Sequence, residues 1–153
     1  MKNDRTSAGD AFSVLAFTVL RLAGQITAAG DALAKPSGQS SARWQVLAAA
    51  EHGSLTVADT GRILGLARQG IQRIADTLEK EGYISYAGNP AHQRAKLLTL
   101  TASGRESLDD IQARQAVWAN ALGAELGEQD LRKAAATLGR FLERLQEERQ
   151  GKA

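Results

Sequence analysis

The sequence predicts a mainly α-helical fold with one small two-stranded β element. Apolar residues recur at spacings of three and four along most of the chain, which is the spacing of a buried helix face. Two short runs, residues 83–86 and 96–100, are strand candidates on either side of a loop rich in turn-forming residues. At 153 residues, the chain can form one small domain with a core together with additional long helices.

A short helix is expected to begin after Thr56. The Thr56 side chain can accept hydrogen bonds from the first backbone N–H groups, and Asp59 stands three residues later, where a capping box places its acid. Gly61 lowers the stability of such a helix by about 1 kcal/mol relative to alanine. We expect this cost to be offset because a residue without a side chain permits the close approach of a second helix. The turn at Gly65 should end this helix and bury the side chain of Leu66.

A second helix is expected from about residue 67 to 81, with Gly82 as the residue that ends it. Its buried stripe would consist of Ile71, Ile74, Ala75 and Leu78. Its other side carries long hydrogen-bonding side chains in the N-terminal half, namely Arg68, Gln69, Gln72 and Arg73. The acidic residues Asp76, Glu79 and Glu81 come later. The two helices, their turn and the two strands form a helix-turn-helix with a wing.

This arrangement points to double-stranded DNA. A recognition helix inserts its N-terminal half into the major groove, where arginine suits guanine edges and glutamine suits adenine edges. Arg68, Gln69, Gln72 and Arg73 would therefore meet base edges and phosphates. Arg94, in the loop between the strands, would enter the adjacent minor groove, and Lys96 and Thr56 would touch the DNA backbone.

Charge and composition agree with a DNA partner. The formal net charge is only +2, but the stretch from Arg62 to Lys96 holds six basic residues against three acidic ones. The chain contains no cysteine, which excludes disulfides, zinc fingers and thiol-based redox sensing. No cofactor is expected.

The N-terminus lacks the profile of a signal peptide and no apolar run is expected to reach the length of a membrane span, so a cytoplasmic location is expected.

Long helices are expected on both sides of the motif. The first, from about residue 12 to 34, has an apolar surface wider than one stripe and needs more than one neighbour, either within a monomer core or on a second subunit. A break at residues 36–38 precedes a helix from residue 40 or 41 to 51. A long helix from 102 to about 123, an interruption at 123–127 and a final helix complete the chain. The first eight residues and the polar tail from 146 are expected to fray.

On these residues the chain resembles the MarR family of bacterial transcriptional regulators. The segments that carry the resemblance are 41–47 (SARWQVL), 64–69 (LGLARQ), 73–82 (RIADTLEKEG) and 94–101 (RAKLLTLT) with Gly104. The resemblance implies a homodimeric repressor or activator, most simply a repressor, on a pseudo-palindromic operator. Residues 1–36 would be an N-terminal dimerisation helix, 37–101 the winged helix-turn-helix, and 102–153 the C-terminal dimerisation helices. The chain departs from the family at His92, where an acid usually orients the wing arginine, and at Gly70.

The resemblance also implies an effector site. Many members of the family lose DNA affinity when a small, often aromatic or anionic, ligand binds. Trp44 could line such a cavity and Arg43 could meet an anion, although a large aromatic residue such as Trp44 more often simply packs in a core.

Two other classes of function fit the sequence less well than DNA binding. A winged-helix module that binds only another protein would carry the same fold, and its binding would respond less steeply to salt than binding to DNA. An enzyme is not expected, because His52 and His92 lack partners at catalytic or metal-ligating spacing and no serine stands in a G-x-S-x-G context.

Overall fold

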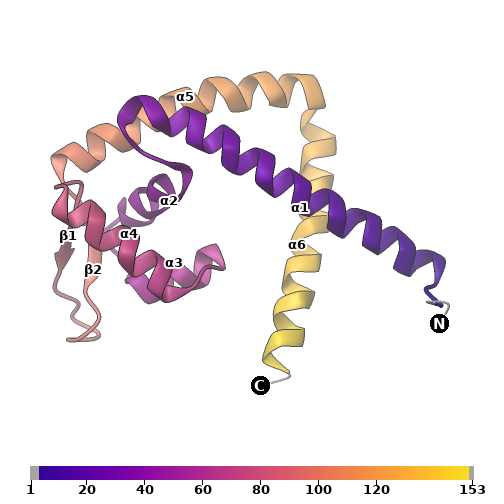
Figure 1. The fold of residues 1–153 in the computed structure, drawn as a ribbon, viewed down its shortest axis with the longest axis horizontal. Coiled ribbons are helices and arrows are strands. Elements are labelled where there is room, and N and C mark those ends of the chain that lie inside the picture. Colours follow the sequence, from indigo (N-terminus) through magenta and orange to yellow (C-terminus); the bar gives the residue numbers. More distant parts are fainter. Residues whose placement is uncertain (1–3, 152–153) are drawn as a thin grey trace. The chain divides into compact units, whose positions relative to one another are not determined.

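The computed structural model describes residues 4–151, and within them it confirms the predicted mainly α-helical class with a two-stranded wing (Figure 1). The elements are α1 (Ser7–Ala34), a 3-10 turn (Lys35–Ser37), α2 (Ser41–Ala50), α3 (Val57–Leu64), α4 (Arg68–Lys80), β1 (Ile84–Ala87), β2 (Leu97–Leu100), α5 (Ala102–Leu126) and α6 (Glu128–Gln150). The strands are antiparallel, and Ile84 pairs with Leu100 and Ala87 with Leu97.

The chain divides into two compact units, and the division falls inside α5. The first unit extends to Gln112 and contains α1 to β2 with the beginning of α5; the second begins at Ala113 and contains the rest of α5 with α6. The functional division predicted at residues 36 and 101 therefore does not coincide with the spatial one, and it stays a prediction.

The core of the first unit lies between α2, α4, the small sheet and the start of α5. It consists of Val46, Leu47, Ala50, Val57, Ile71, Ala75, Leu78, Ile84, Leu98 and Leu108. The predicted buried stripe of α4 is confirmed, since Ile71, Ala75 and Leu78 are buried and Ile74 packs against them. Each fully buried leucine or isoleucine contributes about 1.5–3 kcal/mol, so this face fixes how α4 is rotated.

The predicted capping box of α3 is present. The Asp59 N–H donates to Thr56 Oγ1 at 3.1 Å, and the Thr56 N–H donates to Asp59 Oδ2 at 3.0 Å. Gly65 ends the helix in the left-handed region at φ 66°, where its N–H donates to the Arg62 carbonyl and the next N–H donates to that of Gly61. Gly61 is buried against the following turn, as expected. The expectation for Leu66 is wrong: its side chain is 49% exposed, because the turn directs it away from the core.

Several helix ends lie beyond the predicted positions. The α1 helix begins at Ser7, because Thr6 accepts a hydrogen bond from the Gly9 N–H and caps it. The α5 helix continues through Gly123 to Leu126, and the break comes at Gly127, whose φ is 85°. The α6 helix continues to Gln150, where Arg144 forms ion pairs with Glu147 and Glu148. The predicted fraying of residues 1–3, 152 and 153 lies outside the described residues.

The α1 helix corrects a second expectation. By length and composition alone, the segment Ser7–Ser37 is apolar enough to cross a membrane, which the sequence was not expected to contain. The charged residues within α1 are Asp10, Arg21 and Asp31, and several large apolar side chains between them are exposed, with Leu20 at 72%. A helix that is apolar on several sides needs more than one neighbour.

A close backbone contact joins α5 to the start of the sheet. Gly104 is buried in the first turn of α5, where a Cβ atom would lie 1.9 Å from the carbonyl oxygen of Tyr83. That carbonyl also accepts hydrogen bonds from the N–H and the hydroxyl of Thr101, each at 3.1 Å. Only glycine allows this approach without moving the backbone.

We expect Gly104→Ala to lower the free energy of unfolding by about 1–3 kcal/mol, the usual cost of inserting an atom into a well-packed site. The measurement is chemical denaturation followed by circular dichroism. Gly70→Ala is the matched control: Gly70 also lies in a helix, no atom would lie within 4 Å of its Cβ, and the change should stabilise by up to about 1 kcal/mol. Equal stability of the two variants would contradict this account of Gly104.

Candidate nucleic-acid interface

The α4 helix presents its N-terminal half to solvent. Arg68, Gln69 and Arg73 are exposed, whereas Gln72 is half-buried. The residue before the helix is Ala67, which offers no side-chain cap, so the first backbone N–H groups are not satisfied by a capping side chain. Together with the helix dipole, these N–H groups make the start of α4 favourable for a nearby negative charge.

The wing is held beside the start of α3 because β2 is also tied to the segment before that helix. The Leu98 N–H donates to the Leu55 carbonyl at 2.8 Å, and Thr56 forms an isolated antiparallel bridge with Leu97. Lys96, directly before β2, is thereby brought to the start of α3. Figure 1 shows the β1–β2 hairpin extending past the end of this helical group.

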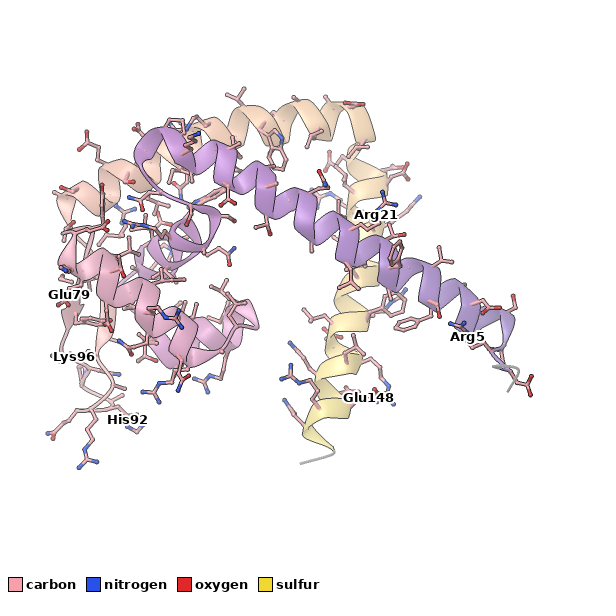
Figure 2. The ribbon with its side chains drawn as sticks, viewed as in Figure 1. Arg5, Arg21, Glu79, His92, Lys96 and Glu148 are labelled. Carbon is pink, nitrogen blue, oxygen red and sulfur yellow. The ribbon has the colours of Figure 1, made fainter. Side chains whose placement is uncertain are left out.

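Asn89 orders the loop that carries Arg94. Its Oδ1 accepts a hydrogen bond from the Ala91 N–H at 3.0 Å, and its Nδ2 donates to the Ala95 carbonyl at 2.8 Å. The loop thus has an internal brace although His92 occupies the position of the family's usual acid. His92 is exposed toward the tip of the loop, with Lys96 closer to the strands (Figure 2).

A groove of about 220 Å³ lies between α3, α4 and the wing. It is lined by Thr56, Val57, Ala58, Arg68, Gln72, Tyr86, Arg94, Ala95 and Lys96. Five of the seven residues predicted to contact DNA therefore meet here, from three separate segments. Gln69 and Arg73 are exposed on α4 but do not line the groove. The lining contains three basic side chains and no carboxylate.

Acidic side chains of the motif are engaged by neighbours within the chain. Asp59 accepts from Thr56 and from Arg62, and the hydrogen bonds from Thr56 are the main cause that lowers the pKa of its carboxyl. Asp76 accepts hydrogen bonds from Gln72 and from Tyr86, both at 2.8 Å. Both carboxylates are thus held by partners of the same chain.

The comparison with known proteins agrees with this geometry. Residues 37–95, which contain the helix-turn-helix and most of the wing, match the family model described as MarR family. The chain belongs to the MarR family. An uncharacterized protein of Mycobacterium tuberculosis is 35% identical over 140 residues, which span 92% of this chain and 98% of that protein. The transcriptional activatory protein BadR of Rhodopseudomonas palustris is 25% identical over 95 residues, or 60% of this chain and 54% of that protein.

Solved structures show the same fold. A MarR family transcription regulator, SP03579, superposes with a TM-score of 0.76 at 24% identity, over 90% of this chain and 94% of that one. CouR from Rhodococcus jostii RHA1, bound to p-coumaroyl-CoA, gives 0.73 at 23% identity over 81% and 88%. The M. tuberculosis regulator MosR in complex with DNA gives 0.67 at 26% identity over 85% and 96%. The MarR assignment and the prediction that the chain is not an enzyme are both confirmed.

Arg43, one of the two residues expected at an effector site, is engaged within this MarR chain. Its guanidinium forms a two-pronged ion pair with Glu81, its Nε donates to Gln39 at 2.7 Å, and it lies 5.8 Å from the centre of the Tyr83 ring. The hydrogen bond from Arg43 is the main cause that lowers the pKa of Glu81. Arg43 therefore braces α2 against the C-terminal end of α4.

Trp44 is partly buried and packs against the core cluster of the first unit. Packing is the simpler of the two roles that the sequence allows for Trp44. A ligand contact by Arg43 or Trp44 stays a prediction.

Tyr86 and Asn89 are the residues of the site that sequence reasoning missed. The spacing of Gln72 and Asp76, four residues apart on one helix, could have indicated their hydrogen bond. The contact of Tyr86 with both depends on how the sheet stands against α4, which no local pattern encodes. The asparagine–proline pair at 89 and 90 marked a turn, but not the two hydrogen bonds that close it.

Proposed function

We propose that this MarR-family regulator binds double-stranded DNA sequence-specifically, as a homodimer on a pseudo-palindromic operator, and represses from it. The observation that carries the proposal is the groove in which Arg68, Arg94 and Lys96 converge from α4 and the wing. Basic side chains without competing carboxylates suit a phosphate backbone. The similarity to MosR, whose structure is a complex with DNA, supports the same reading.

The residues predicted to contact DNA fall into groups by the part of the duplex that each could reach. Arg68, Gln69, Gln72 and Arg73 stand on the half of α4 that would enter the major groove, and Arg94 stands on the wing loop, which would reach the minor groove. Lys96 would contact a phosphate. Thr56 lines the same groove, but it is only 8% exposed and its hydroxyl serves the cap of α3, so its contribution would be to position the other groups.

We expect Arg73→Ala and Arg94→Ala each to weaken operator binding about tenfold near physiological salt, with a salt dependence shallower by about one counterion for each phosphate that the variant no longer neutralises. Fluorescence polarisation over a series of salt concentrations measures both quantities. Arg132→Ala is the control, because it removes the same charge from α6, where Arg132 pairs with Glu128.

Equal affinity of parent, Arg73→Ala and Arg94→Ala would refute the assignment of these arginines. A parent protein whose binding is weak and nearly independent of salt would instead favour the alternative function, a winged-helix module that binds another protein.

The homodimer is proposed from the apolar side chains that the single chain leaves exposed. On α1 these are Phe12, Val14, Phe17, Leu20, Leu22 and Ile26, and on α5 and α6 they are Val117, Leu122, Leu126, Leu131, Leu142 and Leu145. Soluble monomers rarely expose apolar patches of this extent. A second copy would cover them and would hold two α4 helices at the spacing of successive major grooves, about 34 Å.

We expect Leu20→Glu to convert the dimer to a monomer, because a carboxylate cannot be buried in an apolar interface without a partner. Light scattering after size exclusion gives the mass, and loss of operator binding should accompany the change. Gln25→Glu is the control, since it adds the same charge at an exposed polar position of α1. A parent that is monomeric at micromolar concentration, or a Leu20→Glu variant that stays dimeric, would overturn the proposal.

Repression is the simpler outcome of operator binding, because a bound dimer excludes other proteins from the DNA that it covers. BadR, by contrast, is named as an activator, so a reporter gene placed behind the selected operator is the deciding measurement. The proposed location is the cytoplasm, where such a regulator meets its DNA.

We also propose that a small aromatic or anionic effector releases the DNA, in line with CouR, which was crystallised with p-coumaroyl-CoA. An incoming carboxylate that replaces Glu81 on Arg43 would disconnect α2 from the end of α4. The effector would then act on the orientation of the recognition helix from a distance, which is an allosteric coupling between two sites.

We expect at least one aromatic acid in a panel to raise the midpoint of thermal unfolding of the parent, since a ligand that binds only the folded state stabilises it. The shift should disappear in Arg43→Ala, each protein being compared with its own ligand-free midpoint. Arg105→Ala is the control, because Arg105 also pairs with an acid, Glu51, at 2.8 Å. Persistence of the shift in Arg43→Ala would exclude Arg43 as the anion contact.

A further inference from the structure

Gln72, Asp76 and Tyr86 form a closed triangle of hydrogen bonds beside the groove, which Gln72 and Tyr86 line. Gln72 Nε2 donates to Asp76 Oδ1 at 2.8 Å and to the Tyr86 hydroxyl at 3.0 Å. The Tyr86 hydroxyl in turn donates to the same Asp76 oxygen at 2.8 Å. Gln72 and Asp76 come from α4, and Tyr86 comes from β1.

The directions of these three bonds follow from the chemistry of the groups. A carboxylate only accepts, so Gln72 and Tyr86 must both donate to Asp76. The single hydroxyl proton of Tyr86 is then used, and its oxygen must accept from Gln72. A tyrosine hydroxyl keeps its proton at neutral pH, and burial and the hydrogen bond to Asp76 raise the pKa of Tyr86 further. A flipped Gln72 amide would turn its oxygen toward the carboxylate, which is unfavourable.

Both N–H bonds of the Gln72 amide are therefore used inside the chain, and its oxygen Oε1 is the group left to face a ligand. Glutamine recognises adenine with two bonds, one N–H to N7 and one oxygen accepting from the N6 amino group. An amide that can only accept loses the first bond. It can still accept from an amino group in the major groove, which both adenine and cytosine present.

We propose that Tyr86 and Asp76 set the base preference of Gln72 by fixing its amide as a hydrogen-bond acceptor, so that it selects adenine or cytosine over guanine or thymine. The inference rests on the proposed function, because it assumes that α4 enters the major groove. Tyr86 and Asp76 are positioning residues here, and Gln72 is the residue that contacts the base.

The test is selection of binding sites from random duplex DNA with full-length protein. In the parent, one position of each half-site should accept adenine and cytosine at comparable frequencies. Tyr86→Phe frees one Gln72 N–H, so adenine should become favoured there about tenfold, as for a two-bond contact. Asp76→Ala frees the other N–H and should give a shift in the same direction. Gln72→Ala should abolish the preference at that position only.

Two controls separate positioning from general damage. Tyr83→Phe removes the hydroxyl of the chain's other tyrosine and should leave the parent profile unchanged. Ser85→Ala removes the hydrogen bond between Ser85 and Thr99 that joins the two wing strands, at 2.8 Å, without touching the triangle, and should also leave it unchanged. Circular dichroism confirms that each variant is folded.

The outcomes are distinguishable. If the parent selects no site, the proposed function fails. If the parent selects a pseudo-palindrome but Tyr86→Phe and Asp76→Ala keep the parent profile, the assignment of Tyr86 and Asp76 is wrong while the function stands. An adenine preference already present in the parent at that position would also overturn it.

Discussion

The burial of one face of α4 is the constraint on which the rest of the site depends. Ile71, Ala75 and Leu78 occupy the core against α2 and the sheet, so the helix cannot rotate without exposing them. That rotation decides which side chains are left for a ligand. Two further contacts hold the ends of the helix in place: Gly61 lets the turn before α4 approach α3, and Arg43 binds Glu81 directly after it. The hydrophobic core thus sets the orientation of α4, and the polar contacts at its ends hold that orientation.

The electrostatics of the site depend on how the acids near it are engaged. The motif carries several acids, yet Asp59, Asp76 and Glu81 are each engaged by a specific partner of the same chain. Each pairing also has a structural use, because it caps α3, ties β1 to α4 or braces α2. A small net charge is therefore compatible with a groove whose lining is entirely basic or neutral. The distribution of charge, and not its sum, favours a nucleic-acid partner.

Much of the fold could be predicted from local sequence, for identifiable reasons. The Thr56–Asp59 capping box, the glycine at 65 and the apolar spacing of α4 are each determined within a few residues, and all three predictions are confirmed. Two expectations failed on local structure: Leu66 is exposed on its turn, and α5 continues past Gly123. The pairing of Arg43 with Glu81, 38 residues apart, could not be predicted because it depends on how segments distant in the sequence pack together. The same holds for Tyr86, which lies fourteen residues from Gln72 along the chain and contacts it only because of the sheet.

The exposed apolar side chains of α1 are related to the small number of basic side chains in the groove. Three basic side chains line the groove of one chain, and a few phosphate contacts give only weak, salt-sensitive binding. A second copy held at a fixed distance would double those contacts, and the second half-site would then bind intramolecularly, at an effective concentration far above that of free protein. The exposed apolar side chains of α1, which by composition alone would also suit a membrane, are what such a rigid pairing requires. In the proposed dimer the outer helices would contribute to DNA affinity as directly as the arginines, because they would determine whether two weak sites act as one.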